Sequence, residues 1–436
     1  MLAILGFVMI AIFMYLIMSN RLSALIALIL IPLLTAIVSG FGGDVGKMMM
    51  DGIKSIAPTG VMLIFGILYF GIMIDTGLFD PLVSKTLKVV KGDPLKIVIG
   101  TALLALFVSL DGDGTTTFMI VVAALFPLYR QLGMNPLILT CVSIMASGVM
   151  NMLPWGGPTA RVLSALHLDS SQVFVPLIPG MIVTALWVIF VAYVLGKKER
   201  KRLGHIKLPE NLDQVGHERE TAASAEAVSR IRRPKLLWFN MILTVALMIS
   251  LITDLLPLTV LFVIGFAVAL LVNYPNMADQ KERISTHAGN ALSVASMVFG
   301  AGIFTGILTG TGMVNAMADA LVHVIPQSWG PHFPVITAIT SVPFTFFMSN
   351  DAYYFGILPL LNEAAHVYGI SSIEMGRASL IGQQVHLLSP LVPSTYLLVG
   401  MAGVNFGDHQ KFTLKWALGS MVVMLITSLV IGVISL

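Results

Sequence analysis

Apolar stretches long enough to cross a lipid bilayer recur along this chain, and they constrain its fold more than any other feature. An α-helix needs about 20 apolar residues to span the hydrocarbon core of a membrane. Stretches of this kind predict ten spans, near residues 2–18, 21–40, 56–75, 134–165, 173–196, 236–253, 256–274, 287–309, 371–400 and 413–435. The sequence therefore predicts an all-α integral membrane protein.

The composition agrees with this prediction. Of the 436 residues, 57% are hydrophobic and only 11% are charged, whereas soluble proteins carry about 25% charged residues. The mean hydropathy of +0.91 points the same way. The first stretch, 2–18, has neither a preceding basic segment nor a small-residue cleavage pattern, so we expect it to be retained as a span. The net charge of +3 is small and gives no reason to expect a nucleic-acid partner.

Two further apolar regions are interrupted at their centres by polar turns. Region 95–130 contains Asp111-Gly-Asp-Gly114, and region 332–366 contains Ser349-Asn-Asp351. Each arm has only about 15 residues, which is short for a crossing. Irregular backbone at membrane depth is tolerated only inside protein or beside water. We therefore expect two re-entrant helical hairpins with polar tips.

Basic residues indicate the orientation. Segment 197–235 holds eleven of the 25 lysines and arginines, together with six acidic residues. Because cytoplasmic loops are enriched in Lys and Arg, we expect this segment to be a charged cytoplasmic loop of a multi-pass protein of the cell membrane. With the loop inside, only Lys47 and Lys54 among the basic residues outside the spans fall on the outer side, and both termini lie outside.

The two halves of the chain resemble each other at an offset of 235 positions. Residues 70–78 match 305–313, and Pro158-Thr159 matches Pro393-Ser394. Each half holds five spans and one hairpin, and an odd number of spans inverts the second half. We therefore divide the chain into a first membrane repeat, 1–196, with a cytoplasm-side hairpin, the loop 197–235, and an inverted repeat, 236–436, with an outside-facing hairpin.

This plan places a binding site where the hairpin tips meet. Helices broken near Pro154–Pro158 and Ser389–Pro393 expose backbone at the same depth, and broken helices offer N-terminal ends to anions and carbonyls to cations. Asp111, Asp113 and Asp351 at the tips are costly in a membrane unless paired or functional, and such an acidic, oxygen-rich cluster suits Mg²⁺ or Ca²⁺. The alternative is that these acids only cap helices.

Apart from Arg21 and Lys415 at the ends of spans, Arg161 and Arg377 are the only lysines or arginines within the predicted spans. Arginine binds carboxylates through two parallel hydrogen bonds, so both predict a carboxylate-bearing substrate. Alternatively, either one snorkels to the interface or pairs with a structural acid such as Glu374. His386 is a candidate proton carrier, together with Asp113 and Asp351, or else a buried structural histidine. The full set of candidate substrate-binding residues is Thr115, Thr116, Gly156, Gly157, Thr159, Arg161, Ser349, Asn350, Arg377, Gln383, Ser394 and Thr395.

Four segments carry a family resemblance, and it extends over essentially the whole chain. Asp111–Thr117, Leu153–Thr159, Ser349–Asp351 and Gly382–His386 resemble the citrate–divalent-metal/proton symporter family of the ion-transporter superfamily. The resemblance implies import of citrate complexed with a divalent metal and coupled to protons. It also implies a homodimer, an elevator-type motion of a transport domain against a scaffold, and no permanently bound cofactor.

One departure bears on coupling. Sodium-coupled dicarboxylate carriers of the superfamily have Ser-Asn-Thr at each hairpin tip, whereas here the tips read Asp111-Gly-Asp113 and Ser349-Asn-Asp351. Acids in place of neutral hydroxyls argue against sodium coupling and favour a proton or the metal of the complex.

Two other classes of transporter stay open. One is a proton- or sodium-coupled carrier of another organic acid, such as a dicarboxylate or gluconate, and the other is a cation/proton antiporter. We do not expect an enzyme, because no nucleophile–base pair or metal triad of suitable spacing lies in the spans. ATP is not expected to drive transport, because no phosphate-binding loop ending in Gly-Lys-Ser/Thr is present.

Overall fold

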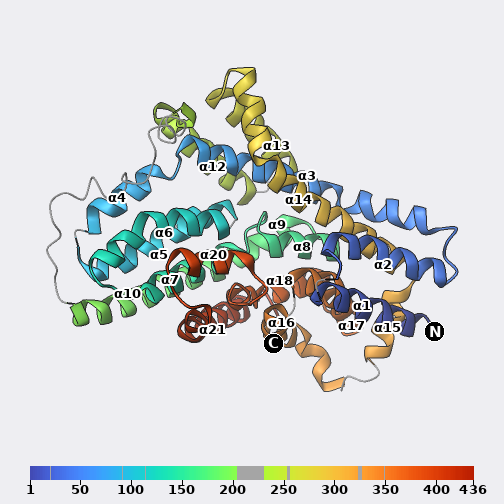
Figure 1. Ribbon diagram of the computed structural model, residues 1–436. Helices are drawn as coiled ribbons and strands as arrows, with labels where there is room; N and C mark the ends of the chain where they lie inside the picture. The colour runs from blue at the N-terminus through green and yellow to red at the C-terminus, as the bar shows by residue number, and fades with distance from the viewer. Residues whose placement is uncertain are drawn as a thin grey trace.

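The computed structural model describes residues 1–19, 21–90, 92–112, 114–203, 230–252, 256–322, 327–347 and 349–436. These residues form helices joined by short turns, with no strand among them (Figure 1), which confirms the all-α prediction. Five helical segments in this part of the chain are long and apolar enough to cross a membrane: Val45–Thr76, Pro94–Asp111, Ser170–Leu203, Met277–Gly310 and Phe406–Val430.

The helices come before and after segment 204–229, which lies outside the described residues. Those before it are α1 (Leu2–Met18), α2 (Ala24–Val38), α3 (Val45–Thr76), α4 (Asp80–Val90), α5 (Pro94–Val108), α6 (Gly114–Gln131), α7 (Pro136–Met150), α8 (Gly157–Leu166), α9 (Ser170–Phe174) and α10 (Ile178–Leu203). Those after it are α12 (Leu237–Ile252), α13 (Leu258–Asn273), α14 (Met277–Gly310), α15 (Met313–Val322), α16 (Phe333–Phe347), α17 (Leu358–His366), α18 (Ser372–Leu380), α19 (Gln383–His386), α20 (Pro393–Met401) and α21 (Phe406–Val430).

Helix pairs occupy both regions expected to form hairpins. The pair α5 and α6 turns at Gly112, whose φ of +78° lies in the left-handed region that glycine adopts without strain. The pair α16 and α17 is joined through a π-helical turn, Ala352–Ile357. The two candidate spans that follow are interrupted, because prolines without an amide N–H stand at the breaks. Residues 134–165 divide into α7 and α8, and residues 371–400 divide into α18, α19 and α20.

The two longest helices, α3 and α14, pack along each other (Figure 1) with their backbones in contact. A Cβ atom on Gly52 would lie 2.0 Å from the carbonyl oxygen of Gly302, and one on Gly306 would lie 2.4 Å from that of Met48. Gly302 and Gly306 form a small-xxx-small pattern, which lets membrane helices approach this closely. Glycine is therefore required along this seam.

The halves of the chain interleave rather than lie apart. Helix α14 packs on α2 as well as on α3, α15 packs on α1, and α21 packs on α10. Figure 1 shows the first helices of the chain beside α15 and α17 from its later part. Each half therefore covers surface that the other half would otherwise expose.

The start and end of the segment expected as a loop are ordered on the helix bundle. Helix α10 continues to Leu203, and Arg200 pairs with Asp93, with Nε 2.9 Å from Oδ1. At the other end, Arg232 donates to the carbonyl of Ile74 (2.9 Å), and Arg233 donates to that of Asn273 (2.7 Å). The middle of the expected loop, 204–229, lies outside the described residues.

Candidate functional site

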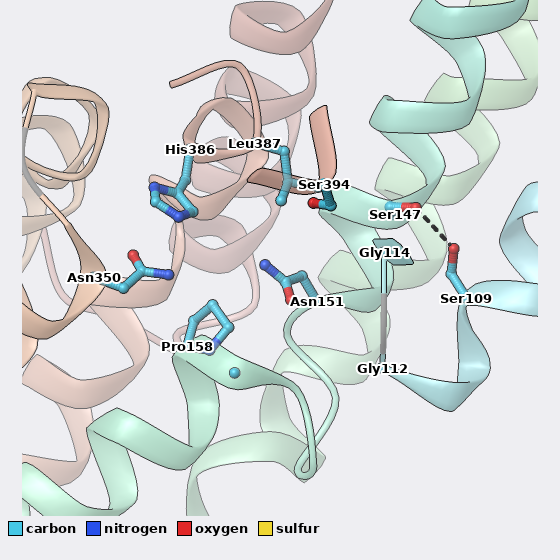
Figure 2. A pocket seen from close by; sticks show the side chains of 11 residues that line it. Ser109, Gly112, Gly114, Ser147, Asn151, Pro158, Asn350, His386, Leu387 and Ser394 are labelled. Atoms are coloured by element: carbon cyan, nitrogen blue, oxygen red, sulfur yellow. Dashed lines mark hydrogen bonds between the residues drawn. The ribbon is translucent and has the colours of Figure 1, made fainter. Parts of the chain in front are cut away.

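A cavity of about 190 Å³ lies where the two hairpins meet the two interrupted helices (Figure 2). Its lining comes from both halves of the chain, and most of it is polar or glycine. The lining residues are Ser109, Gly112, Gly114, Ser147, Asn151, Gly157, Pro158, Asn350, His386, Leu387 and Ser394.

Three helices begin at this cavity. Gly114 is the first residue of α6, Gly157 is the first residue of α8, and Ser394 is the second residue of α20. The residues that precede α8 and α20, Gly156 and Val392, provide no side-chain cap for the free backbone N–H groups. Helix N-termini carry a partial positive charge and present unpaired donors. The cavity therefore favours negatively charged groups.

A threonine hydroxyl forms a hydrogen bond across each of the two helix breaks. Thr159 donates to the carbonyl oxygen of Met152 (3.0 Å), and Thr395 donates to that of Leu387. Each bond runs from the helix after the break to a carbonyl within the break, so that a carbonyl without a helical partner is satisfied. Both threonines were predicted to bind substrate. The structure buries them and uses their hydroxyls to shape the break.

Side chains at the breaks also hold the hairpin tips. The indole N–H of Trp155 donates to the carbonyl of Leu110 (2.9 Å), and the hydroxyl of Ser389 donates to that of Phe346 (2.6 Å). The same kind of bond thus attaches each hairpin to the interrupted helix of its own half. The hairpins and breaks form one connected unit around the cavity.

His386 lines the cavity and lies buried at the end of α19. Its Nδ1 is 2.6 Å from the carbonyl oxygen of Thr345, which can only accept a hydrogen bond. The proton of the neutral ring therefore sits on Nδ1, and Nε2 is the acceptor. Figure 2 shows that His386, Asn350 and Asn151 border the same cavity.

Arg161 and Asp351 form an ion pair next to the cavity, with Nε 2.6 Å from Oδ1. Arg161 also donates to the carbonyl of Gly157 (2.9 Å), and Asp351 follows Asn350, so both residues adjoin the lining. The side chains are 24% and 14% exposed. The residue predicted to hold a carboxylate thus contacts a residue predicted to hold a metal.

Arg377 lies away from this cavity. Its guanidinium donates to the carbonyl oxygens of Gln172 (2.6 Å) and Val433 (3.4 Å), and it is not part of the lining. Glu374, the acid considered as a structural partner for either arginine, instead accepts hydrogen bonds from Ser435. Arg377 therefore ties α18 to two neighbouring segments in this structure.

The acids predicted to bind metal are only partly described. Asp111 is 8% exposed and ends the turn Ser109–Asp111, while Asp113 lies outside the described residues. Within the described ranges, no three His, Cys, Asp or Glu side chains are close enough together to hold a metal ion. Asp351 is engaged by Arg161. The structure thus shows no three-acid cluster in the part of the chain it describes.

The remaining predicted residues surround the second tip or start α6. Gln383 donates to Asn350 (3.1 Å) and to Tyr354 (2.8 Å), and the hydroxyl of Ser349 accepts from the backbone N–H of Ala352 (3.2 Å). Thr115 and Thr116 lie in the first turn of α6, and Gly156 is the N-cap residue of α8. None of these three residues is part of the cavity lining.

A cluster of hydroxyl side chains at the first tip was not predicted from the sequence. Ser109 lies 2.9 Å from Ser147 (dashed in Figure 2) and 3.1 Å from Thr117, between hydroxyl oxygens. Both serines line the cavity. Their only signal was a hydroxyl next to a polar tip or break, which many small polar residues of membrane helices share.

A second cavity, of about 540 Å³, lies between α3, α13 and the segment around α9. It contains none of the candidate residues, and no hairpin lines it. Its polar lining includes His167, whose Nδ1 is 2.8 Å from the hydroxyl of Ser55. The smaller cavity is therefore the candidate site, because the hairpin tips and helix breaks converge only there among the two.

The arrangement of helices is similar to that of two solved structures. The fold is similar to that of the YdaH transporter of Alcanivorax borkumensis, with a TM-score of 0.55 and 14% identity, covering 90% of this chain and 88% of that one. It is also similar to MtrF of Neisseria gonorrhoeae, described as illuminating a class of antimetabolite efflux pumps, with a TM-score of 0.58 and 11% identity over 90% and 84% of the chains.

The sequence comparisons show the family of this chain. The model of the citrate transporter family, CitMHS, matches residues 8–382, and the chain belongs to this family. A Bacillus subtilis (strain 168) protein named citrate transporter is 66% identical over the full length of both chains. The Mg(2+)/citrate complex secondary transporter of the same organism is 54% identical, again over both full lengths.

These findings confirm the resemblance drawn from the tip and break motifs. They also confirm the expectation that the protein is a transporter and not an enzyme, since the family and the named relatives are transporters.

Proposed function

We propose that this protein is a secondary active transporter that imports citrate complexed with a divalent metal and couples the import to protons. One observation carries the proposal: the N-termini of α6, α8 and α20 open on one polar cavity, beside the Arg161–Asp351 ion pair. The N-termini suit the carboxylates of citrate, and an acid next to them suits a cation.

The charge of the cargo fits such a site. Free citrate is a trianion near neutral pH, and one divalent metal leaves the complex a monoanion. Arg161 and the helix N-termini would hold the free carboxylates, while Asp351, Asp111 and Asp113 would face the metal. Oxygen ligands of this kind suit Mg²⁺ or Ca²⁺, and the 54% identical relative is named for the Mg²⁺ complex.

Proton coupling is supported by the acids at the tips and by His386. An Asp near a cation site can exchange a proton for the metal, since both compete for the carboxylate. His386 adjoins the cavity, and Nε2 of its neutral ring is an acceptor. Together these groups would carry the proton that accompanies the complex.

The architecture is proposed to be an inverted repeat with an elevator-type motion. Shifted by 235 positions, α3 falls on α14, α7 and α8 fall on α18 to α20, and the hairpins fall on each other to within a few residues. The proposed units are the repeats 1–196 and 236–436 and a cytoplasmic loop, 197–235. The working form would be a homodimer in the cell membrane.

Reconstitution tests the function directly. Uptake of labelled citrate into proteoliposomes is measured across a panel of divalent metals, with a proton gradient, a sodium gradient or neither, and empty liposomes serve as the control. We expect uptake to require a divalent metal, to rise with an inward proton gradient, and to stop with a protonophore.

Other outcomes would point to the other transporter classes. Uptake that ignores divalent metal would indicate a carrier of free organic acids. Metal exchange against protons without any citrate would indicate an antiporter. Uptake that follows sodium and ignores the protonophore would contradict proton coupling.

A further inference from the structure

The Arg161–Asp351 ion pair joins the two halves of the chain at the edge of the cavity. Arg161 belongs to α8, and Asp351 belongs to the tip of the second hairpin. The pair contains one cation and one anion, and so does the complex of citrate with a metal. In the structure the two charges compensate each other.

We propose that this ion pair selects the metal–citrate complex against either component alone, because only a ligand that brings both charges can replace both partners. The inference rests on the proposed function, in which the cargo is the complex. In the loaded site a citrate carboxylate takes the place of Asp351 at Arg161, and the metal takes the place of Arg161 at Asp351.

Binding of either component alone carries a free-energy cost. Free citrate bound at Arg161 leaves the Asp351 carboxylate without its partner and close to more negative charge. A free metal at Asp351 leaves the guanidinium without its partner and close to more positive charge. Both side chains are largely shielded from water, and an uncompensated charge in such a place is costly. Discrimination therefore comes from the charge that the wrong ligand leaves unpaired.

The geometry holds the two partners in position for this exchange. Arg161 lies one turn from Gly157, on the same face of α8, and its Nη1 bonds to the Gly157 carbonyl. This bond does not involve Asp351, so it can persist after exchange. On the other side, Gln383 fixes Asn350, the residue before Asp351, by donating to its side-chain oxygen. The charged groups can change partners while their supports stay in place.

Neutralising one partner at a time tests the selection. Asp351→Asn releases Arg161, so binding of citrate in metal-free buffer should strengthen about tenfold, the scale of coupling between contacting charges, while binding of the complex weakens. Arg161→Gln releases Asp351, so binding of Mg²⁺ or Ca²⁺ without citrate should strengthen on a similar scale. Calorimetry on the purified full-length protein measures each ligand separately.

Asp93→Asn is a matched control. Asp93 pairs with Arg200 outside the cavity, and asparagine keeps the N-cap acceptor that Asp93 offers to the N–H of Leu95. This variant should bind all three ligands as the wild type does. The double variant Arg161→Gln/Asp351→Asn removes both charges together and should prefer neither component, so it tests the same coupling if one single variant does not fold.

Two failures can be told apart. If the wild type binds the complex and folded Asp351→Asn gains nothing for metal-free citrate, the ion pair does not select and the inference is wrong. If the wild type binds citrate equally well with and without metal, the proposed function itself is wrong.

Discussion

Trp155 connects the first break, the first hairpin tip and the two helices behind them. Its indole N–H donates to Leu110, and its ring lies 5.1 Å from that of Phe70 on α3 and 5.2 Å from that of Phe262 on α13, between centroids. A Cβ atom on Gly112 would lie 2.7 Å from the same ring, so the tip fits closely against it. One side chain therefore positions the cavity wall.

Trp155→Phe keeps an aromatic ring but removes the N–H donor. The carbonyl of Leu110 then loses its partner, and we expect the protein to be destabilised by about 1 kcal/mol. Because the tip loosens, the apparent affinity for citrate should fall more than the maximal rate. Thermal unfolding in detergent and uptake kinetics measure the two effects. Trp329→Phe, at a site 56% exposed, is the control. Equal behaviour of both variants would contradict a role for the Trp155 bond.

Single residues of the site were predictable only where they break a pattern. Acids, glycines and prolines inside apolar stretches marked the tips and breaks. The contact between Arg161 and Asp351, 190 positions apart, had no such mark. Arg161 and Arg377 also looked alike in sequence, because the backbone carbonyls that hold Arg377 leave no trace in residue types.

A partly buried network of charged residues between α3 and α14 was not predicted, for the same reason. The Asp75 carboxylate lies 3.2 Å from Nη1 of Arg283 and 2.8 Å from Nε2 of His287. Asp75 is the last residue of the predicted span 56–75, a position typical of an ordinary helix end. Its partners are more than 200 positions away in sequence, and only the packing of the two helices brings them together.

Among the helices, the contact of α3 with α14 is the most sensitive to added volume. Gly306→Ala places a methyl group 2.4 Å from the Met48 carbonyl, so the helices must separate, and we expect a loss of about 1–3 kcal/mol in stability. Gly289→Ala in the same helix meets nothing within 4 Å and should be neutral or slightly stabilising, as alanine favours helix.

Thermal unfolding of the two variants checks this prediction. Equal melting temperatures would mean that the seam adjusts without cost.

Helix positions were largely recoverable from hydropathy, whereas helix ends were not. Helix α3 begins at Val45, whereas the predicted span begins near residue 56. The prediction missed the first turns because they carry Lys47, Asp51 and Lys54 and are not apolar. The short helices α4 and α15 were also missed, since ten or eleven residues fall below the length of a span. The breaks were predicted because proline and glycine mark them directly.

At the scale of the whole molecule, the predicted orientation rests on the basic residues alone and is open to a direct test. In a background with Cys141 replaced, Ser224→Cys in segment 197–235, which is expected to be cytoplasmic, should resist a membrane-impermeant thiol reagent in intact cells. Gly43→Cys, in the exposed turn before α3, should react. Modification of the cysteine at 224 together with protection of the one at 43 would invert the proposed topology.

The interleaving of the two halves has a consequence for the continuity of the chain. The packing of α3 and α2 on α14, of α1 on α15 and of α10 on α21 holds residues 1–203 against 230–436 independently of the peptide that links them. A gene divided within that linker should therefore still yield a working carrier when both fragments are made in one cell. Either fragment made alone would expose to lipid its own glycine seam and the face that binds the other fragment. It should therefore be degraded.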